Sequence, residues 1–183
     1  MNYFANAGIF LSQTLIGFAL YIVLLRFWMQ WVRADFRNPF GQFIISVTNP
    51  VIIPLRRILP SIGVIDTATV VFAYVIAFLK VVALVILIGR APQWTGVILF
   101  ALGELVRSSV YIFLAAIFIQ IIASWINPYS NHPILSIARS ISEPLLAPAR
   151  RILPPIGGLD LSPIIIIIFL QLTLYLVVAP LQG

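Results

Sequence analysis

Two adjacent pairs of arginines, Arg56-Arg57 and Arg150-Arg151, carry the most distinctive chemistry in this sequence. An arginine side chain is weakly hydrated and presents a planar fork of donors that matches a phosphate group. Isoleucine and leucine follow both pairs, which favours a position at the depth of lipid headgroups, where a basic residue is worth about 1 kcal/mol toward an anionic surface. The four arginines are therefore candidates to bind anionic lipid, a phosphate-bearing ligand or a partner protein. The other interpretation is that they only set the membrane topology.

Each arginine pair lies in a segment that ends in an aspartate just before a long apolar run. An aspartate at that position can cap the following helix by accepting backbone N–H groups. The alternative is an ion pair with an arginine of the same or the other segment, whereas catalysis is remote because no acid or base partner is present. Glycine in each segment suits a sharp turn. The residues of this structural motif are Pro60, Gly63, Asp66, Pro154, Gly157 and Asp160.

A few polar residues interrupt the apolar stretches. Lys80 falls about fourteen residues into one of them, where a charge costs about 2.5–3.5 kcal/mol and is by default a functional hypothesis. The alternative is that its long side chain extends to the membrane surface, as we expect for Arg26. Gln120 and Gln171 are expected to join helices by hydrogen bonds within the membrane.

The sequence offers little for catalysis or metal binding. It has no cysteine, a single histidine (His132) and five carboxylates, which excludes thiol chemistry and iron–sulfur clusters. No nucleophile–base or metal-binding constellation is present. We therefore expect a protein that is not an enzyme, that needs no cofactor and that does not bind nucleic acid directly.

The composition indicates an integral membrane protein. Of the 183 residues 62% are hydrophobic and only 9% are charged, whereas soluble domains are about 45–50% apolar and about 25% charged. The apolar residues come in long unbroken runs, such as residues 163–170 with five consecutive isoleucines. Such runs favour membrane-spanning helices over the alternating strands of an outer-membrane barrel.

Four segments are long enough for the roughly 20 residues that a spanning helix needs. They are residues 8–32, 67–88, 107–126 and 162–181. The third apolar stretch begins near Trp94, but Glu104 and Arg107 interrupt it, so we place these two charges in the outer interface.

The basic residues are distributed unevenly between the loops. Seven of the eleven lie in the two long loops that follow the first and third spans. By the positive-inside rule these loops are cytoplasmic, and both termini and the short middle loop are outside.

The sequence repeats itself after 94 residues. Residues 54–66 align with residues 148–160 without a gap, and nine of the thirteen positions are identical. The chain is therefore predicted to consist of two units, residues 1–90 and 91–183, each a pair of spanning helices joined by a cytoplasmic segment. Since each unit crosses the membrane twice, the two have the same orientation, and we expect a pseudo-twofold axis along the membrane normal.

The cytoplasmic segment of each unit begins with an amphipathic pattern. Phe40, Phe43, Ile44 and Val47 recur at helical spacing, as do the equivalent residues 134–141. This spacing predicts a helix that lies in the plane of the interface. The dipeptides Asn49-Pro50 and Glu143-Pro144 are expected to end it, because a residue before proline avoids the helical region.

The doubled P-x-R-R-I-L-P-x-I-G-x-x-D motif, in a chain of 183 residues with four predicted spans, resembles the YggT/YlmG family of integral membrane proteins. The resemblance covers essentially the whole chain. It implies a bacterial inner-membrane (cytoplasmic-membrane) protein associated with osmotic and salt-stress tolerance. Family relatives are also linked to cell division, nucleoid organisation and assembly of a membrane cytochrome.

Two functions are compatible with these features. The first is osmotic or ion homeostasis, which would require an oligomer because four helices are few for an internal pore. The second is a membrane scaffold or assembly factor that recruits anionic lipid headgroups, further copies of itself or a membrane-protein partner through the Arg-Arg segments. The first unit has Thr67-Ala-Thr69 where the second has Leu161-Ser-Pro163, so the two copies are not equivalent.

Overall fold

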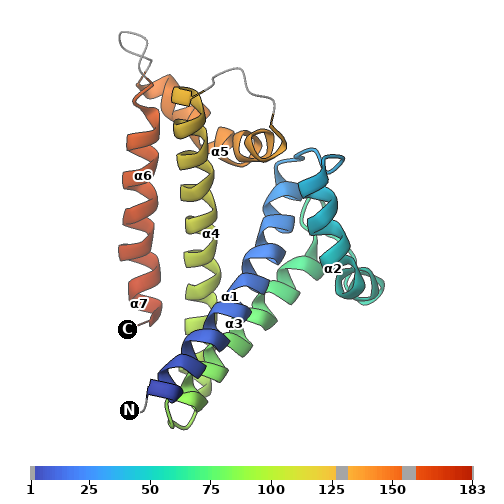
Figure 1. The fold of residues 1–183 in the computed structure, drawn as a ribbon, viewed down its shortest axis with the longest axis vertical. Helices are drawn as coiled ribbons and strands as arrows, with labels where there is room; N and C mark the ends of the chain where they lie inside the picture. Colours follow the sequence, from blue (N-terminus) through green and yellow to red (C-terminus); the bar gives the residue numbers. More distant parts are fainter. Residues whose placement is uncertain (1–2, 127–131, 154–159, 183) are drawn as a thin grey trace.

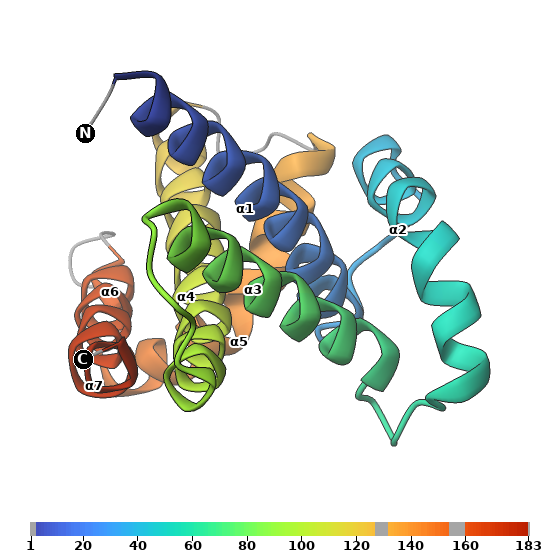
Figure 2. The same cartoon turned by 90° about the horizontal axis from the view of Figure 1, so that it is seen from below.

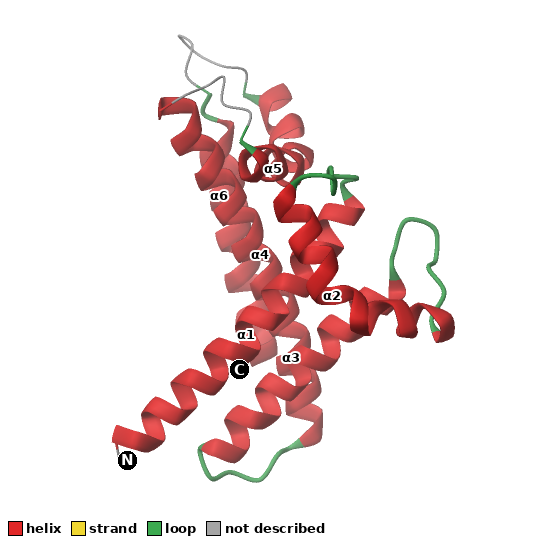
Figure 3. Ribbon diagram, turned by 45° about the vertical axis from the view of Figure 1, so that its right-hand side comes forward, coloured by secondary structure: helices red, strands yellow, loops and turns green. Residues whose placement is uncertain are grey.

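The computed structural model describes residues 3–126, 132–153 and 160–182, and within them all regular secondary structure is helical (Figure 3). The prediction of an all-α protein is therefore confirmed. The elements in chain order are α1 (Tyr3–Trp31), α2 (Pro39–Ile58), α3 (Thr67–Leu87), α4 (Trp94–Ile126), α5 (Pro133–Ile152), α6 (Ser162–Thr173), the π-helical turn η1 (Leu174–Val178) and α7 (Ala179–Gln182).

Four of the described helical segments are long and apolar enough to cross a membrane. They are α1, α3, α4 and the continuous segment α6–η1–α7. In Figure 1, α1 and α4 rise from the end that holds both termini, and α3 and α6 return to it. Helices α2 and α5 lie at the opposite end. The two helix pairs therefore have the same orientation, as the repeat predicts.

The third span begins earlier than predicted, at Trp94 instead of residue 107. Of the two charges that were expected to interrupt it, Glu104 is buried in the helix bundle and Arg107 is partly exposed. Glu104 is 8% exposed and forms ion pairs with Lys80 of α3 and with Arg107 one turn further along α4. Because these charges are paired, they do not force the helix to end. The first span also starts earlier, at Asn6 instead of residue 8, within a helix that begins at Tyr3.

Helices α2 and α5 do not end at Pro50 and Pro144, so that prediction is wrong. Both continue for eight further residues, through a second proline in each, to Ile58 and Ile152. The prolines lie on the exposed side of each helix, where the carbonyl groups they leave without an N–H partner can be solvated. Figure 2 shows the ribbon of α2 bending between its two halves, as proline in a helix interior predicts.

A buried stripe explains why α2 persists despite its prolines. Ile44, Thr48 and Ile52 recur every four residues and are at most 3% exposed. They face the bundle, whereas Phe43 and Val47 on the other side are about half exposed, at 50% and 48%. Packing of one continuous face therefore outweighs the local preference of the residues before proline.

The two repeats do not pack around a twofold axis, contrary to prediction. Helix α3 packs against α4, but the equivalent pair, α6 and α1, is not in contact within the described residues. An apolar cavity of about 430 Å³ lies between them, lined by Leu24 and Trp28 of α1 and by Phe169 and Leu170 of α6.

The asymmetry has a cause in the sequence. The Lys80–Glu104 ion pair joins α3 to α4. The equivalent positions after a shift of 94 residues hold Leu174 and Phe10, which cannot form an ion pair.

The N-terminal turn of α2 packs tightly against the segment before it. Asn38 caps this helix by accepting a 2.8 Å hydrogen bond from the N–H of Gly41. A Cβ atom on Gly41 would lie 2.8 Å from the Cα of Phe36, a backbone atom that cannot easily move. Glycine is therefore required here for space.

We expect Gly41→Ala to lower the free energy of unfolding by about 1–3 kcal/mol, the usual cost of overpacking. Unfolding of the purified protein in mixed micelles, followed by circular dichroism, measures the change. Gly8→Ala is the matched control because a Cβ atom there meets nothing within 4 Å. Equal stability of the two variants would contradict the tight contact.

Candidate functional site

The repeated motif folds into a closed loop in the first repeat. Arg56 lies on the last turn of α2, and the chain leaves the helix at Leu59. Ile62 and Ile65 then exchange two backbone hydrogen bonds of 3.0 Å around Gly63, whose φ of +60° lies in the left-handed region that favours glycine. The chain thereby reverses and brings Asp66 back to Arg56.

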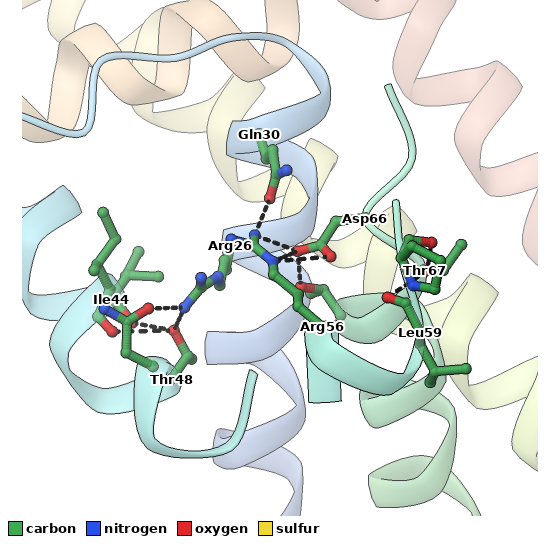
Figure 4. Close-up of polar contacts among 12 residues, drawn as sticks. Arg26, Gln30, Ile44, Thr48, Arg56, Leu59, Asp66 and Thr67 are labelled. Carbon is green, nitrogen blue, oxygen red and sulfur yellow. Dashed lines mark hydrogen bonds and ion pairs between the residues drawn. The ribbon is translucent and has the colours of Figure 1, made fainter. Parts of the chain in front are cut away.

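The Arg56–Asp66 ion pair closes this loop (Figure 4). Nη2 of Arg56 lies 2.6 Å from Oδ2 of Asp66, and its Nε lies 3.2 Å from Oδ1. Asp66 is 1% exposed and also accepts a 2.5 Å hydrogen bond from the hydroxyl of Thr69. Arg56 donates in addition to the amide oxygen of Gln30 on α1 at 3.2 Å. These contacts therefore hold the two ends of the loop together and attach the loop to the first span.

The second repeat contains the equivalent ion pair. Nε of Arg150 lies 2.8 Å from Oδ2 of Asp160, and Nη1 lies 2.8 Å from Oε1 of Glu143. The other oxygen of Asp160 accepts a 2.9 Å hydrogen bond from the backbone N–H of Ser162. The carboxylate of this pair is more exposed than that of the first, since the Asp160 side chain is 33% exposed and that of Asp66 is 0% exposed. Pro154 and Gly157 lie outside the described residues.

Both aspartates have lowered pKa values. Burial alone would raise the pKa of Asp66, but hydrogen bonds from Arg56 and Thr69 outweigh it and hold the pKa below its usual range. Burial likewise opposes ionisation of Asp160, and contacts with Ser162 and Arg150 lower its pKa. The carboxylates are therefore held in the ionised form that the ion pairs require.

The structure separates the roles of the two aspartates. The Asp66 side chain makes no hydrogen bond to the backbone of α3, so the side-chain capping interpretation is wrong for it and the ion pair within the same segment is correct. Asp160 does both, because it pairs with Arg150 and accepts from the first backbone N–H of α6.

The two arginines of each pair also differ. Arg56 and Arg150 are bound to carboxylates, whereas Arg57 and Arg151 are exposed and form no ion pair with the described residues. Helices α2 and α5 touch each other, but their C-terminal ends lie on opposite sides of the bundle in Figures 1 and 2. The four arginines therefore form two separate sites and not a single patch.

A second repeated contact joins each first span to its interfacial helix. Nη1 of Arg26 donates to the hydroxyl of Thr48 at 2.5 Å and to Oδ1 of Asn49 at 2.8 Å. Arg26 is only 5% exposed, so it does not extend to the membrane surface as expected. In the second repeat the hydroxyl of Ser142 donates a 2.5 Å hydrogen bond to Oε1 of Gln120.

These two contacts occupy equivalent positions. A shift of 94 residues places Arg26 over Gln120 and Thr48 over Ser142. This relation between the two pairs was not predicted from the sequence. Comparing only the polar positions of the two repeats would have shown it.

Lys80 is neither free nor extended to the surface. Its ammonium group pairs with Glu104, and its backbone carbonyl accepts a 3.0 Å hydrogen bond from Gln13 of α1. The side chain of Gln171, in contrast, is exposed and makes no hydrogen bond with the described residues. Among those residues no group of three or more histidine, aspartate or glutamate side chains could hold a metal ion.

These features define a multi-pass, all-helical membrane protein built from two parallel repeats, each with an interfacial helix and an arginine–aspartate ion pair. The sequence model of the CCB3/YggT family matches residues 5–87 and 99–181, two segments that start 94 residues apart, like the repeats. The chain belongs to this family.

Several relatives match over nearly their whole length. The chain is 42% identical to the "Uncharacterized protein in proC 3'region" of Vibrio alginolyticus, with 93% of each chain covered. It is 37% identical to the "Uncharacterized protein YggT" of Escherichia coli K12, with 90% of this chain and 86% of the relative covered. An uncharacterized protein of Pseudomonas aeruginosa is 41% identical, with 94% and 89% covered. No solved structure matches.

The difference in burial predicts unequal effects of removing the two carboxylates. Asp66→Asn should lower the free energy of unfolding by about 1–3 kcal/mol, between the values typical of exposed and buried ion pairs. Asp160→Asn is the matched control and should cost less than about 1 kcal/mol, because its carboxylate is one third exposed and more accessible to water. Denaturation in mixed micelles at pH 7 compares them.

The Asp66→Asn variant also tests how stability depends on pH. A lowered native pKa means that the carboxylate stabilises the fold above the ordinary aspartate pKa of about 3.9. That stabilisation is lost as the pH falls below this value and through the native pKa. Between pH 6 and pH 3, Asp66→Asn should therefore lose less stability than the unmodified chain. An equal loss in both would contradict the assignment.

Proposed function

We propose that this protein is a non-enzymatic scaffold of the bacterial inner membrane that recruits anionic lipid, and through it partner proteins, at its cytoplasmic face. One observation carries the proposal. Each interfacial helix ends in two arginines, of which the first is bound to an aspartate and the second is exposed without an ion partner among the described residues.

This division between adjacent arginines favours a binding role for Arg57 and Arg151. Arg56 and Arg150 pair with Asp66, Asp160 and Glu143, and none of these three carboxylates forms an ion pair with Arg57 or Arg151. A guanidinium group held on an ordered helix loses little conformational freedom when it binds a phosphate. Ile58 and Ile152, which follow, are 77% and 79% exposed and supply apolar surface for the adjacent acyl chains.

The orientation follows from the charge distribution. Seven of the eleven basic residues lie at the end of the bundle that holds α2 and α5, and such loops stay in the cytoplasm. The relatives that match come from bacteria, and an all-helical span is typical of the inner membrane. Both termini would then be outside.

Replacing the exposed arginines should reduce the preference for anionic lipid. With spin-labelled phosphatidylglycerol and phosphatidylcholine in reconstituted membranes, Arg57→Gln and Arg151→Gln should each lower the relative association constant at their site by up to about fivefold, the equivalent of about 1 kcal/mol. The electron paramagnetic resonance spectrum of the motionally restricted lipid measures the change.

Two controls make this experiment specific. Arg37→Gln removes one positive charge from an exposed position before α2 and should have a smaller effect. Arg57→Lys keeps the charge but not the donor fork, and should retain part of the preference. If the double variant Arg57→Gln/Arg151→Gln kept the full preference for phosphatidylglycerol, the scaffold proposal would lose its basis.

The second candidate is the osmotic and salt-stress role, exercised through ion homeostasis by an oligomer. The observation that favours it is the Lys80–Glu104 ion pair between two membrane spans. Intramembrane charges are costly and commonly mark ion pathways. Since Lys80 and Glu104 belong to different repeats, this contact is also independent of the repeated loops.

Ion flux into liposomes tests the second candidate. The unmodified protein should leak K⁺ or Cl⁻ faster than empty liposomes, and Lys80→Met/Glu104→Leu should abolish the leak. The double variant removes both charges together, so neither is left buried without its partner. Arg37→Gln is the charge control. A leak equal to that of empty liposomes, or one that survives the double variant, would exclude this pathway.

A further inference from the structure

A cavity lined by both charged and apolar residues lies at the end of the bundle opposite the arginine–aspartate loops. It has a volume of about 500 Å³ and is enclosed by α1, the C-terminal half of α3, the loop after α3 and the N-terminal half of α4. In Figure 1 this region is the end where the loop between α3 and α4 lies near the N-terminus. The polar residues that line it are Gln13, Lys80, Arg90, Gln93, Glu104 and Arg107.

The cavity has an excess of positive charge. Three of its lining residues are cations and one is a carboxylate. Glu104 is shared, because it contacts Lys80 and also lies 3.5 Å from Arg107. Arg90 is exposed and has no ion partner among the described residues. The lining residues together carry a net charge of +2. At the edge of a low-dielectric region such a charge favours a bound anion.

The depth of the cavity favours an amphiphile. Lys80 lies seven residues before the end of α3 at Leu87, or about 10 Å along a helix that rises about 1.5 Å per residue. The cations therefore extend from the headgroup layer into the hydrocarbon. Between them the walls are apolar, with Leu84 of α3, Ile88 directly after α3 and Phe100 of α4. These three side chains are 36%, 41% and 40% exposed.

We propose that this cavity binds an anionic phospholipid of the leaflet at that end of the bundle. The headgroup phosphate would lie at Arg90, at the end of the bundle, and an acyl chain would follow Leu84 and Ile88 toward Lys80 and Arg107, which lie deeper and share Glu104. A free anion would satisfy the cations but would leave these apolar walls uncovered. The site shares no residue with the Arg57 and Arg151 sites, so it does not depend on the scaffold proposal.

Trp94 reports on this site. It follows the lining residue Gln93, is 60% exposed, and stacks on Phe78 of α3 with a ring separation of 6.4 Å. In the full chain with Trp28, Trp31 and Trp125 changed to phenylalanine, Trp94 is the sole tryptophan. Bromine on a lipid chain quenches tryptophan fluorescence at short range. Dibrominated phosphatidylglycerol, added to the protein in neutral detergent, should quench Trp94 at a several-fold lower mole fraction than dibrominated phosphatidylcholine.

Arg90→Gln/Arg107→Gln should remove that preference. Both side chains are exposed or partly exposed, and Lys80–Glu104 remains intact in this variant, so the fold is retained. Arg37→Gln, at the other end of the bundle, should keep the preference. Inorganic phosphate at millimolar concentration should not displace the lipid.

Three outcomes would overturn the proposal. Equal quenching by the two lipids would show that the cavity does not select an anion. An unchanged preference in Arg90→Gln/Arg107→Gln would place the selectivity elsewhere in the chain. Displacement of the lipid by inorganic phosphate would identify a free-anion site instead of a lipid site. None of these results bears on the experiments with Arg57 and Arg151.

Discussion

A single constraint organises this protein: hydrocarbon does not hydrate charge, so polar side chains at membrane depth need partners from the chain itself. Arg26 is buried against Thr48 and Asn49, and Asp66 is buried against Arg56. Each of these contacts joins a span to an interfacial helix or loop. The positions of α2 and α5 therefore depend on satisfying polar groups as much as on apolar packing.

The prolines of the interfacial helices show how tertiary packing overrides local preference. Taken alone, Pro50 and Pro144 should end a helix, yet both helices continue because one face is continuously buried and the prolines lie on the other. Because α2 continues to Ile58, Arg56 lies on its last turn, and only one loop separates it from Asp66. If α2 ended at Asn49, the ion pair would have no helix to hold its arginine.

The two repeats share a design but not a full set of contacts. Both contain the arginine–aspartate pair and the contact between the first span and the interfacial helix. Thr69, which supports Asp66, is replaced by proline at position 163, and Lys80 is replaced by leucine at position 174. The ion pair with Glu104 therefore draws α3 to α4 on one side only, and the bundle opens on the other, between α1 and α6.

The sequence by itself determined the membrane class, the four spans, the repeat and the parallel orientation, because these depend on composition and on periods along the chain. It also placed Gly63 in a turn and identified Lys80 as a charge within a membrane span. Only the tertiary structure decided which arginine of each pair binds a carboxylate, that Lys80 meets Glu104, and that the Gln171 side chain has no hydrogen-bond partner in the part of the chain that the structure describes. The physical reason is that a side chain's partner is chosen by helices that pack from distant parts of the chain, and such distances are not encoded in local spacing.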